Sequence, residues 1–208
     1  MKTLTMPLSS DAILDLHKGD PVQLSGIMIT ARDAAHKWMF DTFIKQTRQP
    51  QGDDLEVYEA IKPLLDGGAI YHCGPVVAGL DTKDYRFAAA GPTTSTREEP
   101  YQGAVMHHFN VRAVIGKGGM GAKTLAACGE VPGVYLHAIG GAASLIAQCV
   151  TRVVGVHKLS FGVPEAMWVI EVKDFPAVVT MDAHGQSLHA VIDQQSKVEL
   201  DRLLAVPL

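Results

Sequence analysis

Two positively charged side chains stand inside glycine-rich turns, where they could bind an anion. Arg97 follows the turn 91–96 at the expected start of a helix, and Lys117 interrupts the glycines of the run 116–121. A cation at the N-terminus of a helix opposes the helix dipole and costs stability. A bound anion would offset that cost, so both positions indicate an anion site.

Arg32 is a third candidate, because it ends an expected strand immediately before Asp33. Its guanidinium group could bind a carboxylate through two parallel hydrogen bonds. The alternative is an ordinary surface ion pair, which contributes little to stability. His36, one helical turn further on, could contact the same ligand or serve only in packing. The sequence leaves both alternatives open.

The glycine-rich turns themselves expose backbone N–H groups, which together with a helix N-terminus can bind an anion. Such turns occur at 91–97, 116–121 and 140–143. For any one of them, a tight turn or a helix cap explains the glycines equally well. Thr96 with Glu99, or Ser95 with Glu98, fits a capping box that would begin the helix after the first turn.

Other kinds of chemistry have weaker support. The run 116–121 matches G-x-G-x-x-G, but the acidic residue that dinucleotide folds carry about twenty positions later is missing. The histidines are scattered, and no C-x-x-C occurs. Cys73, Cys128 and Cys149 are therefore interpreted as small buried hydrophobic residues, and no metal ligands are predicted in this chain.

Length and composition indicate what kind of protein carries these side chains. The chain has 208 residues, of which 47% are hydrophobic and 19% charged, as expected for one globular domain spanning 1–208. The net charge of −4 argues against nucleic-acid binding. An odd number of three cysteines, without a signal sequence or membrane span, favours a reducing, cytoplasmic setting.

The pattern of elements predicts an α/β fold with glycine-rich loops at the strand ends. Alternating or β-branched segments predict strands at 22–30, 69–73, 86–90, 111–115, 135–139 and, as a pair, 167–173 and 177–182. Helical spacing predicts helices at 33–46, capped by Asp33, and at 122–128 and 142–153, whereas 57–65 is ambiguous.

Several of these segments, taken in order, resemble a known family. They are 32–36 (RDAAH), 71–75 (YHCGP), 91–97 (GPTTSTR), 116–121 (GKGGMG), 140–143 (GGAA), 165–168 (EAMW), 174–177 (DFPA) and 182–185 (DAHG). The combination resembles the β subunit, or C-terminal domain, of class I fumarate hydratases and L-tartrate dehydratases. The resemblance extends from about residue 4 to about residue 188.

The resemblance implies a hydro-lyase for a C4 dicarboxylate, built on a swivelling β/β/α domain. Such enzymes use a 4Fe–4S cluster, which the resemblance places on a partner α subunit rather than on this chain. Because most soluble assemblies are symmetric, we expect a homodimer of this chain or a heterotetramer with that subunit. Charge and hydropathy predict no role for nucleic acid or membrane. The rival hypotheses are a non-catalytic anion-binding domain and a nicotinamide-binding domain.

The resemblance also assigns roles to individual residues. Thr93 is similar to the family's catalytic threonine, which works with an aspartate of the other subunit. Substrate-carboxylate binding is implied for Arg32, Arg97 and Lys117, with Thr94 and Gly118 as neighbours of the ligand. Many relatives have an apolar residue and then an acid after this arginine. Here Glu98 and Glu99 follow, and a charge at Glu98 would weaken anion binding or indicate another substrate.

Overall fold

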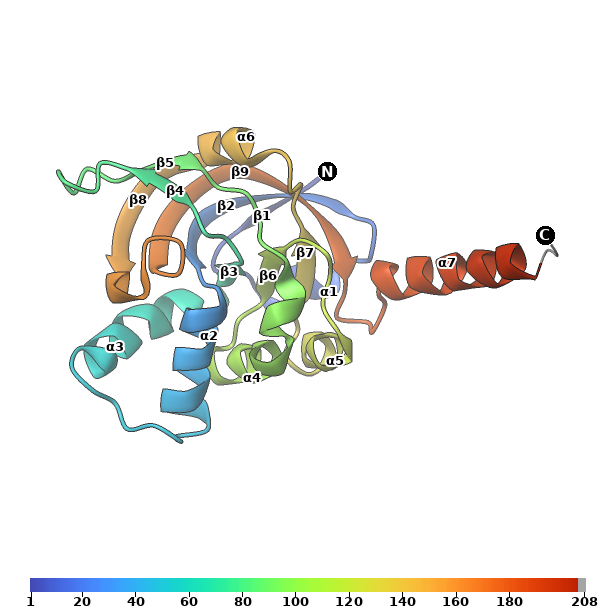
Figure 1. Ribbon diagram of the computed structural model, residues 1–208, viewed down its shortest axis with the longest axis horizontal. Coiled ribbons are helices and arrows are strands. Elements are labelled where there is room, and N and C mark those ends of the chain that lie inside the picture. The colour runs from blue at the N-terminus through green and yellow to red at the C-terminus, as the bar shows by residue number, and fades with distance from the viewer. Residues whose placement is uncertain (206–208) are drawn as a thin grey trace.

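A sheet that closes on itself forms the centre of the computed structural model, which describes residues 1–205 (Figure 1). Its strand order is β1-β2-β3-β6-β7-β9-β8, and an additional pairing joins β2 to β9, so that β2, β3, β6, β7 and β9 form a small barrel-like ring. The strands are β1 (Lys2–Thr5), β2 (Pro21–Thr30), β3 (Ala69–Tyr71), β6 (Ala113–Gly116), β7 (Val134–His137), β8 (Val150–His157) and β9 (Met167–Met181).

Helices cover the outside of this ring. On one side lie α2 (Asp33–Met39), which continues into a π-helical turn (Phe40–Ile44), α3 (Asp54–Leu65), α4 (Glu99–Phe109) and α5 (Ala122–Glu130). A ribbon of β4 (Val76–Ala78) and β5 (Arg86–Ala89) and helix α6 (Ala143–Gln148) lie on another side (Figure 1). The remaining helical segments are α1 (Ser10–Leu14) and the 3₁₀ turns η2 (Ser95–Glu98) and η3 (Leu159–Phe161).

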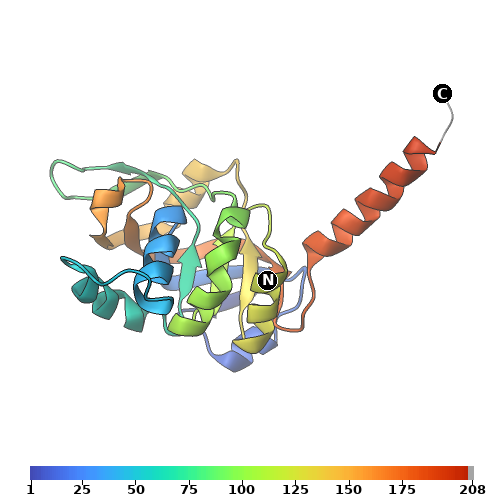
Figure 2. The ribbon, with the colours of Figure 1, turned by 60° about the horizontal axis from the view of Figure 1, so that its bottom comes forward.

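The last helix, α7 (Leu188–Leu204), points away from the body of the protein (Figures 1 and 2). None of its residues is buried. Across residues 1–205, no helix combines the length and the apolar character that crossing a membrane requires.

Alternation along the central strands creates two hydrophobic cores. In β3, Ala69 and Tyr71 belong to the core inside the ring, whereas Ile70 packs in the core under α2–α5. In β7, Leu136 points inward and Tyr135 outward in the same way. This is the period-two pattern of a strand buried on both faces. The predicted α/β class is confirmed. Both tryptophans, Trp38 and Trp168, are buried.

Two predicted elements are wrong in detail, and a third is present with a partner that the sequence did not indicate. The helix expected at 142–153 ends at Gln148 and β8 begins at Val150, because the β-branched run 150–156 favours a strand. The tail is one continuous strand, β9, in which Asp174 adopts a φ of 54° instead of breaking the strand into a pair. Residues 86–89 form a strand, but it pairs with β4 outside the main sheet.

A buried ion pair fixes α3 to the turn after β8. Lys158 contacts Asp54, which also accepts hydrogen bonds from Trp38 Nε1 at 2.8 Å and from Arg48 at 2.9 Å. Both partners of the pair are almost fully buried. We therefore expect Lys158→Met to lower the free energy of unfolding by about 3 kcal/mol, because it removes one charge of a buried pair. Denaturant unfolding at pH 7 measures this.

Lys2→Met is the matched control, since Lys2 pairs with Asp15 and Asp20 on the surface. We expect it to change the free energy of unfolding far less, because exposed pairs contribute little. Equal effects of the two substitutions would contradict the structural role given to Lys158.

Candidate functional site

The three glycine-rich turns meet at one edge of the sheet. The parallel strands β3, β6 and β7 end together there, because Tyr71 pairs with Ile115, and Gly116 with His137. Thr94 and Lys117 form a bridge between the first two turns. A Cβ atom added to Gly140, in the third turn, would lie 3.1 Å from Lys117 Cδ. The fold therefore brings together segments that are distant in the sequence.

Arg97 and Thr93 are in direct contact. The guanidinium group of Arg97 donates a hydrogen bond from Nη2 to Thr93 Oγ1 at 2.9 Å. The same nitrogen lies 3.4 Å from Asp33 Oδ1, on the neighbouring helix α2. Asp33 is not the cap of that helix as predicted: Arg32 occupies the N-cap position, without a side-chain cap bond. Instead, the Asp33 carboxylate faces Arg97.

Lys117 is held by backbone hydrogen bonds on both sides. Its N–H donates to the Thr93 carbonyl at 3.2 Å, and its own carbonyl accepts from the Ser95 N–H at 3.0 Å. Gly118 follows with a φ of +81°, which only glycine adopts easily, and a Cβ there would lie 3.7 Å from Thr94. The two turns 93–95 and 117–118 therefore lie side by side.

Arg32 reaches the same region from the end of β2. Its Nη2 forms an ion pair with Glu165 Oε1 at 3.1 Å, and Ala34 N–H donates to the other oxygen of that carboxylate. Its Nε is buried and has no hydrogen-bond partner among residues 1–205. The ion pair that the sequence analysis gave as the alternative role of Arg32 is present. The Nε–H group of Arg32 still has a free hydrogen-bonding capacity within residues 1–205.

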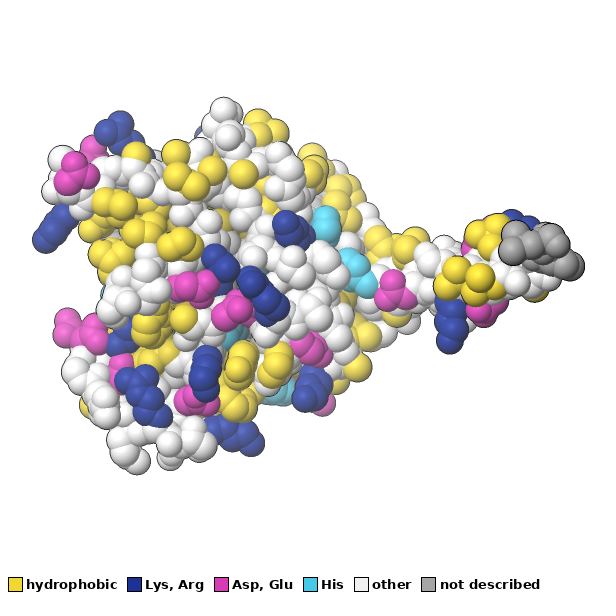
Figure 3. Space-filling view, viewed as in Figure 1, with side chains coloured by type: hydrophobic (Ala, Val, Ile, Leu, Met, Phe, Trp, Pro, Cys, Tyr) yellow, Lys and Arg dark blue, Asp and Glu magenta, His cyan; other side chains and the backbone are white. Residues whose placement is uncertain are grey.

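The charges around Thr93 leave the region positive. Arg32 pairs with Glu165 and Arg97 pairs with Asp33, so Lys117 adds one unit of positive charge to the region when Glu98 is neutral. Figure 3 shows Lys and Arg side chains gathered with Asp and Glu side chains over the region between α2 and the start of α4. Such a site is suited to a small anion with more than one carboxylate.

A buried polar network supports these residues from below. His36 Nδ1 contacts the Arg32 carbonyl at 3.0 Å, and His72 Nδ1 contacts Ser95 Oγ at 2.8 Å. The side-chain amide of Gln102 lies 2.9 and 2.8 Å from the Nε2 atoms of the two rings. Burial lowers the pKa of both imidazoles, so both are neutral at pH 7.

Neutral rings that donate from Nδ1 accept a hydrogen bond at Nε2. The NH₂ group of Gln102 must therefore face them, and this orientation also gives that group its partners. His36 thus serves in packing and positioning. The sequence offered only one signal of this network, the spacing of four residues between Arg32 and His36.

Glu99 has a role that sequence reasoning did not find. Its carboxylate accepts hydrogen bonds from the N–H groups of Gly121, at 2.8 Å, and Lys123, at 3.0 Å, and from the Thr124 hydroxyl at 2.7 Å. It therefore occupies the N-terminus of α5 as a cap from another helix. The predicted capping box is wrong, and this helix N-terminus holds a carboxylate of the chain itself rather than a ligand.

The cysteines do not form a metal site. Cys73 lies in the core inside the ring and Cys128 in the core under the helices, on opposite faces of the sheet. Burial raises the pKa of each thiol to about 12, so both are protonated. Residues 1–205 contain no group of three His, Cys, Asp or Glu side chains that could hold a metal ion. These residues do not fit an iron–sulfur cluster.

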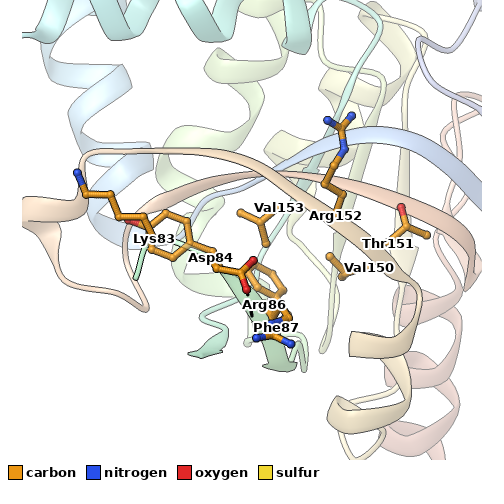
Figure 4. Close-up of a pocket in the computed structure, with 9 residues that line it drawn as sticks. Lys83, Asp84, Arg86, Phe87, Val150, Thr151, Arg152 and Val153 are labelled. Carbon is orange, nitrogen blue, oxygen red and sulfur yellow. Dashed lines mark ion pairs between the residues drawn. The ribbon is translucent and has the colours of Figure 1, made fainter. Parts of the chain in front are cut away.

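A separate groove of about 490 Å³ lies between the β4–β5 ribbon and β8. Figure 4 shows its charged side chains, Lys83, Asp84, Arg86 and Arg152, together with apolar ones such as Val153. Arg86 pairs with Asp84. None of the six predicted site residues lines it, so we take the meeting point of the three turns as the candidate site.

The family model for the fumarase C-terminus matches residues 2–192. The chain belongs to this fumarase family. It is 50% identical over 200 residues to a Geobacillus stearothermophilus protein provisionally named a class I fumarate hydratase. It is 33% identical over 190 residues to the L(+)-tartrate dehydratase β subunit of Escherichia coli. An archaeal chain from Methanocaldococcus jannaschii, provisionally named a tartrate dehydratase β subunit, is also 33% identical, over 201 residues.

These relatives differ in how much of their own length this chain covers. The matched segments are 96%, 91% and 96% of this chain, respectively. They cover only 36% of the Geobacillus protein, but 87% and 96% of the two β subunits. The predicted family is confirmed, and in the Geobacillus relative this unit is one part of a longer protein.

Proposed function

We propose that this chain is the dicarboxylate-binding part of an iron–sulfur hydro-lyase that reversibly hydrates fumarate to malate, with residues 1–208 as one domain. The observations that support the proposal are the hydrogen bond from Arg97 to Thr93, the backbone hydrogen bond from Lys117 to Thr93, and the position of Arg32 immediately before Asp33, which pairs with Arg97. The 50% identity to a relative named as a fumarate hydratase favours fumarate. Dehydration of L-tartrate is the second candidate, favoured by the match to the tartrate dehydratase β subunit.

The three cations supply binding and electrostatic stabilisation. A guanidinium group binds a carboxylate through two hydrogen bonds, and an ammonium group acts as a point charge. Removing a proton next to a carboxylate creates further negative charge on that group. Positive groups already in place stabilise this charge more strongly than water does. Thr94 and Gly118 border the same space.

Thr93 is the candidate for proton transfer. Its Oγ1 accepts a hydrogen bond from Arg97 at 2.9 Å, which orients the hydroxyl and stabilises negative charge on it. A threonine hydroxyl alone is a poor base. We therefore expect an acidic side chain of a partner to share the proton with it.

A partner α subunit would complete this site. The region is open: the Arg97 side chain is 46% exposed, and Ile139, beside the third turn, is 67% exposed. Exposed apolar residues beside a charged site are typical of a surface that a partner covers. Because residues 1–205 contain no group of side chains that fits the cluster, we assign the 4Fe–4S cluster to that partner.

The experiment is anaerobic co-expression of this chain with a cluster-type α subunit from the same organism. We expect a complex that converts malate to fumarate, with a lower kcat/KM for L-tartrate. The reverse preference would make the tartrate reaction the main activity. A chain that binds dicarboxylates but never forms a catalytic complex would contradict the proposal and support a non-catalytic anion-binding domain.

Gly74→Ala tests the position of Arg32. An added Cβ would lie 2.3 Å from Arg32 Nη1 and 3.0 Å from the Pro164 carbonyl, so the guanidinium group must move. We expect KM to rise about tenfold, the loss of roughly one hydrogen bond to a charged group. Gly155→Ala is the control, since an added Cβ there has nothing within 4 Å and the residue lies in β8, outside the three turns. Steady-state kinetics with equal KM values for both variants would remove Arg32 from the site.

A further inference from the structure

Glu98 follows Arg97 in the sequence and is fully buried. It is the last residue of η2, and neither of its carboxyl oxygens accepts a hydrogen bond from a donor among residues 1–205. Asp33 Oδ1 is also buried and accepts no hydrogen bond from a donor in the described part of the chain. An ionised carboxylate with no donors is costly to bury. The two carboxyl groups face one another, and a hydrogen bond between them requires a proton on one of them.

The environment decides which carboxyl group carries this proton. Burial raises the pKa of Glu98 to about 8, and the hydrogen bond with Asp33 adds to the shift. Burial also acts on Asp33, but the hydrogen bond from Glu98 and the charge of Arg97 hold its pKa below its usual value. At pH 7 the proton therefore lies on Glu98, and Asp33 is the ionised partner.

We propose that Glu98 is a positioning residue: as a neutral acid it donates a hydrogen bond to Asp33, and Asp33 in turn holds Arg97 against Thr93 in the orientation that receives a substrate carboxylate. The contacts form a chain. Glu98 faces Asp33, Asp33 Oδ1 lies 3.4 Å from Arg97 Nη2, and that nitrogen donates to Thr93 Oγ1 at 2.9 Å.

Ionisation of Glu98 would break this arrangement. The groups that face Glu98 are Asp33 on α2, Arg97 in η2 and Tyr135 on β7. Burial raises the pKa of Tyr135 to about 12, so it stays neutral. A second carboxylate beside Asp33 would repel it and attract Arg97 away from Thr93. It would also cancel the unit of positive charge that favours a dianionic substrate.

The consequence is a pH-dependent affinity. If only the protonated form binds well, the apparent KM at pH 9 is about tenfold higher than at pH 7, for a pKa of about 8. This part of the inference rests on the proposed function. The proton on Glu98 and its hold on Arg97 are properties of the chain itself.

The first measurement uses the full chain alone. The NMR resonances of the Arg97 side chain, assigned with Arg97→Lys, are followed between pH 6 and 9.5 in the wild type and in Glu98→Gln. Glutamine keeps a neutral donor toward Asp33. We expect a titration midpoint between pH 7 and 9 in the wild type and none in Glu98→Gln. A wild type without a midpoint in that range would overturn the proposal, whatever the activity of the complex.

The second measurement uses the assembled enzyme and the same variants. We expect the rise in KM above pH 8 to disappear in Glu98→Gln, whereas Glu98→Leu, which has no donor, has a raised KM at every pH. A KM profile of Glu98→Gln that matches the wild type would also overturn the proposal. A midpoint in the isolated chain, together with a complex that has no hydro-lyase activity, would contradict the proposed function and leave the role of Glu98 toward Arg97 standing.

Discussion

Arg97→Ala in the assembled enzyme is expected to lower kcat/KM by about 100- to 1,000-fold, the usual effect of removing one donor aimed at a developing negative charge. The free energy of unfolding should change little, because the Arg97 side chain is 46% exposed. Two losses combine in this variant. The substrate loses a carboxylate-binding group, and Thr93 loses the hydrogen bond that orients it.

Arg86→Ala is the matched control for this prediction. Arg86 is also an exposed arginine paired with a single aspartate, but it lies on the β4–β5 ribbon and outside the site. We expect it to keep wild-type kinetics. Stopped assays under anaerobic conditions with malate measure both variants, and a similar kcat/KM for the two would show that Arg97 is not part of the site.

Thr93→Val is expected to have a different kinetic signature. Valine keeps the shape and the branching of threonine but lacks the hydroxyl. We therefore expect kcat to fall by about 100-fold or more, with a KM close to that of the wild type, because proton transfer is affected and carboxylate binding is not. Loss of binding without loss of kcat would instead give Thr93 a role in substrate binding only.

The control for Thr93→Val is Thr96→Val. Thr96 is exposed in the same loop, and its hydroxyl makes only a long contact of 3.5 Å with the Gly119 carbonyl. We expect wild-type kcat from this variant. Full progress curves at several substrate concentrations separate kcat from KM for both.

The sequence was sufficient for β2, β3, β5, β6, β7 and β9, but not for β1, β4 and β8. Short buried strands followed by glycine-rich turns predict loops at one sheet edge, and the bridge between Thr94 and Lys117 shows that two of them meet there. The closing of the sheet was not predicted, because the pairing of β2 with β9 joins segments about 150 residues apart. Local periodicity carries no information on such a pairing.

The roles of two acidic residues also could not be predicted from the sequence. Glu98 and Glu99 are neighbours in the sequence, and both looked like charges near the anion site. Glu99 caps α5, more than twenty residues away, and Glu98 is buried against Asp33 as a neutral acid. The charge at Glu98 that would weaken anion binding is therefore absent at pH 7. Only the tertiary contacts decide what each carboxyl group does.

The most direct test of the account is the crystal structure of the assembled complex with a bound dicarboxylate. We predict that the guanidinium group of Arg97 and the ammonium group of Lys117 lie within about 3.2 Å of carboxylate oxygens. Thr93 Oγ1 should face the carbon that loses the proton. A ligand bound entirely by the partner subunit, out of reach of these three side chains, would contradict the account.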